Sequence, residues 1–160
     1  MYFSSLVKQE LAQIRPQDRL EQKGELLAFI LLKGQLDSEN ELLSINIDNL
    51  IMIKAVYFLF KKVFRVEAKI ETVKKKNNRK NYFIKISGLK KIRHILTELH
   101  LTVNPKGKVI NCQQLIDRDC SCIDQFSDRG FLRGAFMTGG FINDPERMYH
   151  LEISCHRRDE

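Results

Sequence analysis

The alternation of apolar and polar positions divides the first hundred residues into helices and pairs of strands. Apolar residues that recur at i, i+3 and i+4 predict a helix, and strict alternation predicts a strand. In chain order the pattern predicts a helix over 6–14, a helix over 21–33, a strand near Leu36 paired with a strand over 42–47, a helix over 48–64, strands over 68–73 and 82–86, and a helix over 89–99. After the first helix, the predicted order is therefore helix, two strands, helix, two strands, helix.

Residues at the predicted boundaries are of the kinds that begin and end helices. Ser4 or Ser5, Asp48 and Ser87 are the expected N-caps, because their side-chain oxygens can accept hydrogen bonds from first-turn N–H groups. Gly34 is expected to stop the second helix.

The chain after residue 103 reads as a linker followed by a second, shorter section. Pro105 and Gly107 favour a linker over 104–111. Helices are predicted in the 117–126 region and over 128–140, and the alternation over 148–155 predicts a strand. The expected organisation is an N-terminal helix (1–20), a first unit (21–103), a linker (104–111) and an incomplete second unit (112–160).

Small residues stand in the helix predicted over 128–140, where bulky ones are usual. Gly134 and Thr138 are four residues apart and share a face, and Ala135 follows Gly134. An interior glycine costs a helix about 0.5–1 kcal/mol relative to alanine, and close docking of a second helix would offset that cost. A weaker copy of the pattern places Ala28 in the earlier helix. The alternative is two unrelated buried helices that both end at glycine.

These segments resemble the motif helices of LAGLIDADG homing endonucleases, and more specifically the WhiA family of bacterial sporulation and cell-division regulators. The resemblance rests on residues 3–11, 25–36, 132–140 (LRGAFMTGG), 143–145 and 149–153. It implies an α+β fold with a LAGLIDADG-like αββαββα unit, an incomplete second unit, and motif helices packed at a pseudo-twofold seam. The residues expected at that seam are Ala28, Gly34, Gly134, Thr138 and Gly140.

The resemblance also implies a function. We expect a non-catalytic DNA-binding regulator involved in cell division and chromosome segregation, and in sporulation gene control in sporulating relatives. The family is about twice as long as this chain and carries a C-terminal helix-turn-helix, so the chain is expected to stop before that element. Specific DNA recognition in the family is expected to rest mainly on the helix-turn-helix.

Charge supports a phosphate-bearing partner. The net charge is +7, and cations cluster between residues 74 and 80. The candidate DNA-contacting residues are Lys74, Lys75, Lys76, Arg79, Lys80 and Lys85. A second cluster consists of Lys85, Lys90, Lys91 and Arg93. The alternative is a solvated hairpin tip and an exposed helix face.

The acids of a LAGLIDADG nuclease are missing at the matching positions. In the family motif a metal-binding acid immediately precedes the last glycine, and those positions hold Lys33 and Gly139 here. Asp37 and Asp144 follow in predicted turns, where turn formation is the simpler role. We therefore expect no enzyme activity, no cofactor and no metal.

The sequence also leaves open a metal site and two rival functions. Cys120, Cys122, His150, Cys155 and His156 could form a tetrahedral zinc site, although reduced thiols are the default in a cytosolic protein. An active nuclease and a protein-interaction module that self-associates through an incomplete second unit are the rival functions. Without a secretory signal or an 18-residue apolar run, a cytoplasmic location, near the nucleoid or elsewhere, is expected.

Overall fold

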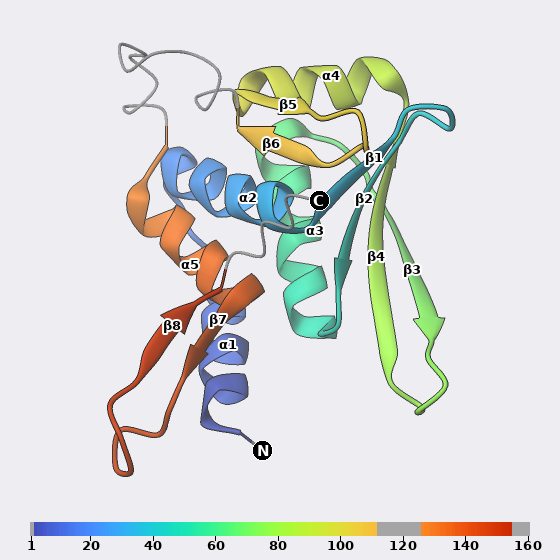
Figure 1. Ribbon diagram of the computed structural model, residues 1–160. Helices are drawn as coiled ribbons and strands as arrows, with labels where there is room; N and C mark the ends of the chain where they lie inside the picture. The colour runs from blue at the N-terminus through green and yellow to red at the C-terminus, as the bar shows by residue number, and fades with distance from the viewer. Residues whose placement is uncertain (1, 112–125, 155–160) are drawn as a thin grey trace.

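A computed structural model describes residues 2–111 and 126–154 of the protein. The helices are α1 (Phe3–Gln13), α2 (Arg19–Lys33), α3 (Leu50–Phe64), α4 (Leu89–Glu98) and α5 (Asp128–Gly139). The strands are β1 (Gly34–Asp37), β2 (Leu42–Ile47), β3 (Lys69–Lys74), β4 (Lys80–Ser87), β5 (Leu101–Val103), β6 (Val109–Asn111), β7 (Gly140–Ile142) and β8 (Leu151–Ile153). The order from α2 to α4 confirms the predicted succession of helix, two strands, helix, two strands, helix (Figure 1).

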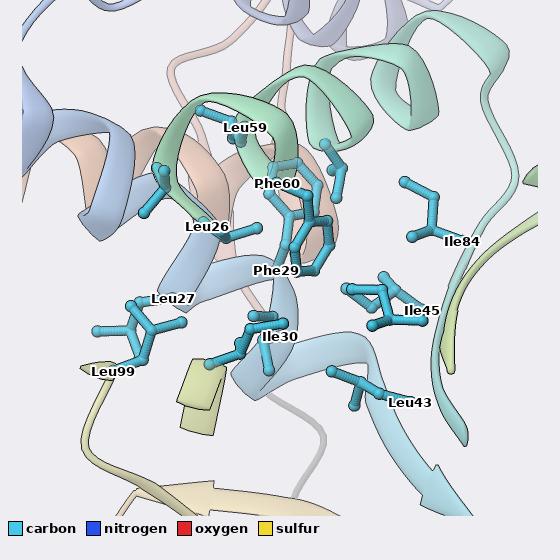
Figure 2. Close-up of a cluster of buried hydrophobic side chains, with 14 of the residues drawn as sticks. Leu26, Leu27, Phe29, Ile30, Leu43, Ile45, Leu59, Phe60, Ile84 and Leu99 are labelled. Atoms are coloured by element: carbon cyan, nitrogen blue, oxygen red, sulfur yellow. The ribbon is translucent and has the colours of Figure 1, made fainter. Parts of the chain in front are cut away.

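The main sheet is antiparallel and has the strand order β1-β2-β4-β3. Ile45 of β2 pairs with Ile84 of β4, so apolar residues of neighbouring strands share the inner face. Figure 2 shows these two residues in the same cluster as Phe29 of α2 and Phe60 of α3, and all four are almost completely buried. The core therefore lies between the sheet and helices α2 and α3.

The helix starts differ from the predicted caps. Helix α1 is preceded by Tyr2, without a side-chain cap, and α4 is preceded by Gly88 at a φ of 104°. Asn49, rather than Asp48, caps α3, since its Oδ1 accepts hydrogen bonds from Ile51 N at 2.8 Å and Met52 N at 3.2 Å. The predictions of Asp48 and Ser87 as caps were wrong by one residue. Residue type alone does not show which of two neighbouring residues, such as Asp48 and Asn49, caps a helix. It also does not show where a glycine with positive φ, such as Gly88, precedes the helix in place of a capping side chain.

Ser4 was also expected to cap a helix and has another role. It is buried within the first turn of α1, and its Oγ accepts a hydrogen bond from Ile142 N at 3.3 Å. This contact joins α1 to the strand that follows α5.

The segment predicted as a linker contains part of a hairpin. Strands β5 and β6 pair antiparallel, and Asn104 Oδ1 accepts hydrogen bonds from the N–H groups of Lys106 and Lys108 in the turn. Leu36 N of β1 donates to Gly107 O at 2.7 Å. The hairpin thus lies against the first unit.

The second section contains α5 and a short hairpin of β7 and β8. Most of the predicted 117–126 helix lies outside the described residues. Strand β8 is shorter than the predicted strand over 148–155. Within residues 2–111 and 126–154, no helix is long and apolar enough to cross a bilayer.

Candidate functional site

Helices α2 and α5 pack side by side at a close approach (Figure 1). A Cβ atom added to Gly134 would lie 2.6 Å from Glu25 O and 2.8 Å from the Ala28 Cβ. A Cβ on Gly24 would lie 2.5 Å from Ser127 O. These separations are too short for real side-chain contacts, so glycine is required where the backbones meet.

Gly130 extends this contact toward the start of α5, because its added Cβ would collide with Glu21 O. Gly24 and Gly130 were not among the residues predicted for this contact. A signal was present: Gly24 and Ala28, like Gly130 and Gly134, are four residues apart and lie on one helix face. We call the surface formed by Gly24, Ala28, Gly130 and Gly134 the helix seam.

The other three residues predicted for the seam lie at the helix ends. At Gly34 the nearest atoms to an added Cβ belong to Ile30 of α2, and at Gly140 they belong to Phe136 of α5. Each glycine is therefore closest to the helix that it follows, and not to the partner helix. Thr138 Oγ1 donates to Ala135 O at 2.9 Å. Both glycines are extended, at φ of −76° and −77°, so neither uses the left-handed conformation of a glycine C-cap.

A buried ion pair crosses the helix seam. Arg133 Nε donates to Glu25 Oε2 at 2.8 Å, and the two side chains are only 7% and 1% exposed. Arg133 Nη2 has no hydrogen-bond partner within the described part of the chain, but it lies 3.5 Å from Glu21 Oε2. Burial raises the pKa of Glu25, and the hydrogen bond and charge of Arg133 oppose that shift. The pair joins the two helix faces that meet at the seam.

The basic hairpin tip lies at the end of β3 and β4. All of residues 74–80 are exposed, and Lys75 N donates to Arg79 O at 2.8 Å to close the turn. Asn78 occupies the left-handed region at a φ of 56°. The five cations predicted within this segment, Lys74, Lys75, Lys76, Arg79 and Lys80, are therefore displayed together on one projecting turn (Figure 1).

Lys85 differs from the other predicted DNA-contacting residues. Its Nζ lies 2.5 Å from Glu71 Oε2, and Lys69 lies 3.5 Å from the same carboxylate. The hydrogen bond from Lys85 is the largest cause of the lowered pKa of Glu71. Lys85 is therefore largely neutralised on the sheet. Lys90, Lys91 and Arg93 lie on α4, at the end of the molecule opposite the hairpin tip (Figure 1).

Replacing Lys85 with methionine is expected to raise the pKa of Glu71 back toward its ordinary value, because the main donor to the carboxylate is lost. A carboxyl-carbon NMR titration measures this. Lys69→Met, which removes the longer contact, should produce a smaller rise. An unchanged Glu71 titration in Lys85→Met would show that the pair does not form in solution.

A cavity of about 580 Å³ opens beside the C-terminal ends of α2 and α5. Its cationic lining residues are Lys8, Lys33 and Lys75, and its acidic one is Asp48. Burial lowers the pKa of Lys8; Asp48 opposes this shift and the charge of Lys33 adds to it. We call this space the lysine cavity.

The positions of the nuclease acids fall beside the lysine cavity. Lys33 ends α2 and lines the cavity, and Gly139 ends α5 between the lining residues Thr138 and Gly140. A lysine and a glycine supply no ligand oxygen from their side chains, and a lysine repels a divalent cation.

Asp37 and Asp144 serve the turns that follow these helices. Asp37 accepts hydrogen bonds from Asn40 Nδ2 at 2.7 Å and from two backbone N–H groups, and the Asn40 bonds lower its pKa. Asp144 Oδ1 accepts from Glu146 N at 3.0 Å. Both aspartates thus have the turn role that the sequence allowed.

The zinc hypothesis falls largely on residues that the structure does not describe. Cys120, Cys122, Cys155 and His156 lie outside residues 2–111 and 126–154. His150 is described, and its Nε2 lies 3.3 Å from Glu152 Oε2 on an exposed hairpin. Within the described ranges, no group of three or more His, Cys, Asp or Glu side chains has the geometry of a metal site.

Known proteins share this combination of sequence and fold. The WhiA N-terminal LAGLIDADG-like domain matches residues 19–102, and the WhiA LAGLIDADG-like domain matches residues 128–160. Proteins named "Probable cell division protein WhiA" from Bacillus mycoides (strain KBAB4) and Bacillus cereus (strain B4264) are each 35% identical over 157 residues, which cover 96% of this chain. The chain spans 48% of the length of each of these relatives.

Solved structures show the same fold. Full-length DUF199/WhiA from Thermatoga maritima aligns with a TM-score of 0.58 and 21% identity, over 96% of this chain and 44% of that one. The N-terminal LAGLIDADG domain of DUF199/WhiA aligns with a TM-score of 0.60 and 24% identity, over 94% of this chain and 65% of that one. The match to the WhiA N-terminal domain covers more than half of the chain, and the chain therefore belongs to the WhiA family of proteins with LAGLIDADG-like domains.

Proposed function

We propose that this chain is the DNA-contacting, non-catalytic part of a WhiA-type cell-division protein. The observation that carries the proposal is the projecting basic hairpin tip, with five exposed cations and no acidic residue between positions 74 and 80. The named function of the relatives, cell division, supports the cellular role. Chromosome segregation, sporulation gene control and a position at the nucleoid in the cytoplasm belong to the same proposal.

The hairpin tip is better suited to contacts with the DNA phosphates than to sequence-specific contacts with the bases. Lysine and arginine side chains on an exposed turn can each neutralise a phosphate, and such contacts carry no sequence information. The expected binding is therefore weakly selective for sequence and strongly dependent on salt.

Reversing two charges at the hairpin tip is expected to weaken duplex binding and flatten its salt dependence. Each lost phosphate contact should reduce the slope of log K against log salt by about 0.9. Filter binding of a duplex at low and moderate salt, comparing the wild type with Lys74→Glu/Lys76→Glu, measures both effects.

A matched control changes the net charge by the same amount elsewhere. Lys90→Glu/Lys91→Glu acts on α4, at the opposite end of the molecule from the hairpin tip (Figure 1). It should bind DNA much more tightly than the tip variant. Equal affinities for the two double variants would remove the hairpin tip from the proposed interface.

The absence of catalysis in this proposal rests on Lys33 and Gly139. A nuclease of this fold needs two carboxylates to hold Mg²⁺ against a phosphate, and these two residues supply none. The rival nuclease would have to use Asp37 and Asp144. It requires Mg²⁺-dependent cleavage that Asp37→Asn and Asp144→Asn abolish, whereas we expect no cleavage by any of the three proteins.

The proposal includes a repeated motif. In the first copy α2 runs into β1 at Gly34, and in the second α5 runs into β7 at Gly140, each followed by an antiparallel partner strand. The helix seam then lies on the pseudo-twofold axis that relates the copies.

A protein-interaction role is the second candidate, and a specific surface favours it. Phe141, Met148, Tyr149 and Leu151 are exposed on and beside the β7–β8 hairpin. Exposed apolar residues that lie together often mark contact sites. If this surface dominates, light scattering will show self-association that Leu151→Ser and Tyr149→Ser reverse while DNA binding is unchanged.

A further inference from the structure

The lysine cavity has the size and shape of a small-molecule site. Its volume of about 580 Å³ falls within the range of ligand pockets, about 300–1,000 Å³. It is far larger than one ion requires. It is also concave, whereas the hairpin tip that we assign to DNA projects into solvent (Figure 1).

The charge of the cavity favours an anion. Three lysines and one aspartate line it, so the formal balance is +2. The C-terminal ends of α2 and α5 each bring a partial negative charge of about half a unit, and the first turns of α1 and α3 bring partial positive charges of the same size. These helix-end contributions largely cancel, and the lysines decide the sign.

A buried polar group in the wall also suits a ligand. Asn81 is only 8% exposed and lines the cavity, and none of the side-chain hydrogen bonds found among the described residues uses its amide. An amide that faces the cavity can both donate and accept, so a ligand bound there can form a hydrogen bond with it.

Apolar side chains form a smaller part of the remaining wall, beside the polar residues Ser4, Ser5, Asn46, Asn49 and Thr138. Phe29, Met52 and Met137 are buried at the cavity, and the aromatic side chains of Tyr2 and Phe141 are exposed at its edge. These side chains do not stabilise an inorganic phosphate, but they can pack against the ring of a larger ligand. The two kinds of lining thus call for a ligand with an anionic end and an apolar or aromatic end.

We propose that the lysine cavity binds a small phosphorylated molecule of about nucleotide size, with its phosphate held by Lys8 and Lys33 and its ring against the aromatic and methionine wall. Asn81 hydrogen-bonds the bound molecule. The cavity and the hairpin tip share Lys75, whereas Lys74 and Lys76 belong to the hairpin tip and do not line the cavity.

Isothermal titration calorimetry with pyrophosphate and with ADP tests the site. Pyrophosphate reports the phosphate chemistry alone, and ADP adds a ring. We expect both to bind at millimolar or lower concentration, ADP more tightly, and adenosine not measurably. Lys8→Met and Lys33→Met should each weaken ADP binding about tenfold, as expected for one charge-assisted hydrogen bond.

Controls separate this site from general charge and from DNA. Lys91→Met removes one exposed cation from α4 and should leave ADP affinity unchanged, while Lys33→Arg should retain most of it. The Asn81 side-chain amide resonances should move when ADP is added. Lys74→Glu/Lys76→Glu should keep full ADP affinity even though it loses duplex binding, so failure of either proposal is visible without the other.

Any one of three results with small ligands would overturn the site, and a fourth comes from competition with DNA. The three are the absence of pyrophosphate binding at millimolar concentration, ADP binding no tighter than pyrophosphate binding, and equal losses of affinity in Lys33→Met and Lys91→Met. Displacement of ADP by duplex DNA in the Lys74→Glu/Lys76→Glu background would assign the phosphate to the nucleic-acid backbone and would also overturn it.

Discussion

Replacing Gly130 with alanine should lower the free energy of unfolding by about 2–3 kcal/mol, near the upper end of overpacking costs. The sign is informative, because alanine is intrinsically the better helix residue by about 0.5–1 kcal/mol. The added Cβ would collide with the backbone carbonyl of Glu21, which cannot rotate away as a side chain can. The two helices would have to separate along their length. Urea unfolding followed by circular dichroism measures the loss.

Controls on the same helix make this result specific. Leu132→Ala shortens a side chain that is 57% exposed on α5 and should change stability by less than about 0.5 kcal/mol. Gly24→Ala should resemble Gly130→Ala, since its Cβ meets the carbonyl of Ser127. A Gly130→Ala protein as stable as the wild type would mean that α2 and α5 do not pack this closely.

Replacing Arg133 with methionine should destabilise the protein by about 3–5 kcal/mol, the usual cost of leaving a buried charge without its partner. Glu25 would remain 1% exposed with its main donor gone. The double variant Glu25→Leu/Arg133→Met should recover most of the loss, because it removes both charges and keeps similar volume. Arg129→Met is the matched control, since that side chain is 83% exposed and pairs with Glu21 at 3.4 Å on the surface.

The pH dependence supplies a second readout for Arg133→Met. Because burial raises the folded-state pKa of Glu25, the folded protein holds its proton to higher pH than the unfolded chain. Its stability contribution is therefore largest below the unfolded pKa, and is lost as pH rises through the folded pKa. Without the opposing charge of Arg133, this decline should be steeper and extend to higher pH than in the wild type. Identical pH profiles would show that the two side chains are not coupled.

Much of the fold could be predicted because it depends on local periodicity. Strand β2 lies over the residues that alternation predicted, and α2 and α5 begin and end within two residues of the predicted bounds. Position-specific details were less accessible. The choice between Asp48 and Asn49 as a cap depends on the backbone path into α3, which a composition rule does not contain.

The helix seam was partly visible in the sequence. The small-residue pattern led to Ala28 and Gly134, which the structure places against each other. Gly24 and Gly130 were not predicted because the resemblance pointed to the C-terminal ends of the two motif helices. The close approach lies nearer the N-terminal ends of α2 and α5. The buried ion pair was not foreseen, since residues 25 and 133 are 108 positions apart and only the packing of α2 on α5 joins them.

The hairpin tip and the lysine cavity differ in the same way, because the first is local in the sequence and the second is not. The hairpin tip is a local run of cations, so the sequence displays it directly. The lysine cavity draws on α1, on the ends of α2 and α5, on the start of α3 and on the hairpin tip. No local pattern connects Lys8, Lys33 and Asn81. Likewise, the pairing of Lys85 with Glu71 across two strands depends on the register of β3 and β4.

The most direct test of the central claim, that this LAGLIDADG-like fold holds DNA phosphates without cutting them, is to incubate the protein with supercoiled plasmid and Mg²⁺ across a range of salt. We expect retarded plasmid at low salt, release as salt rises, and fully supercoiled DNA after the protein is removed. Nicked or linear plasmid that disappears with Asp37→Asn, or no retardation even at low salt, would contradict the claim.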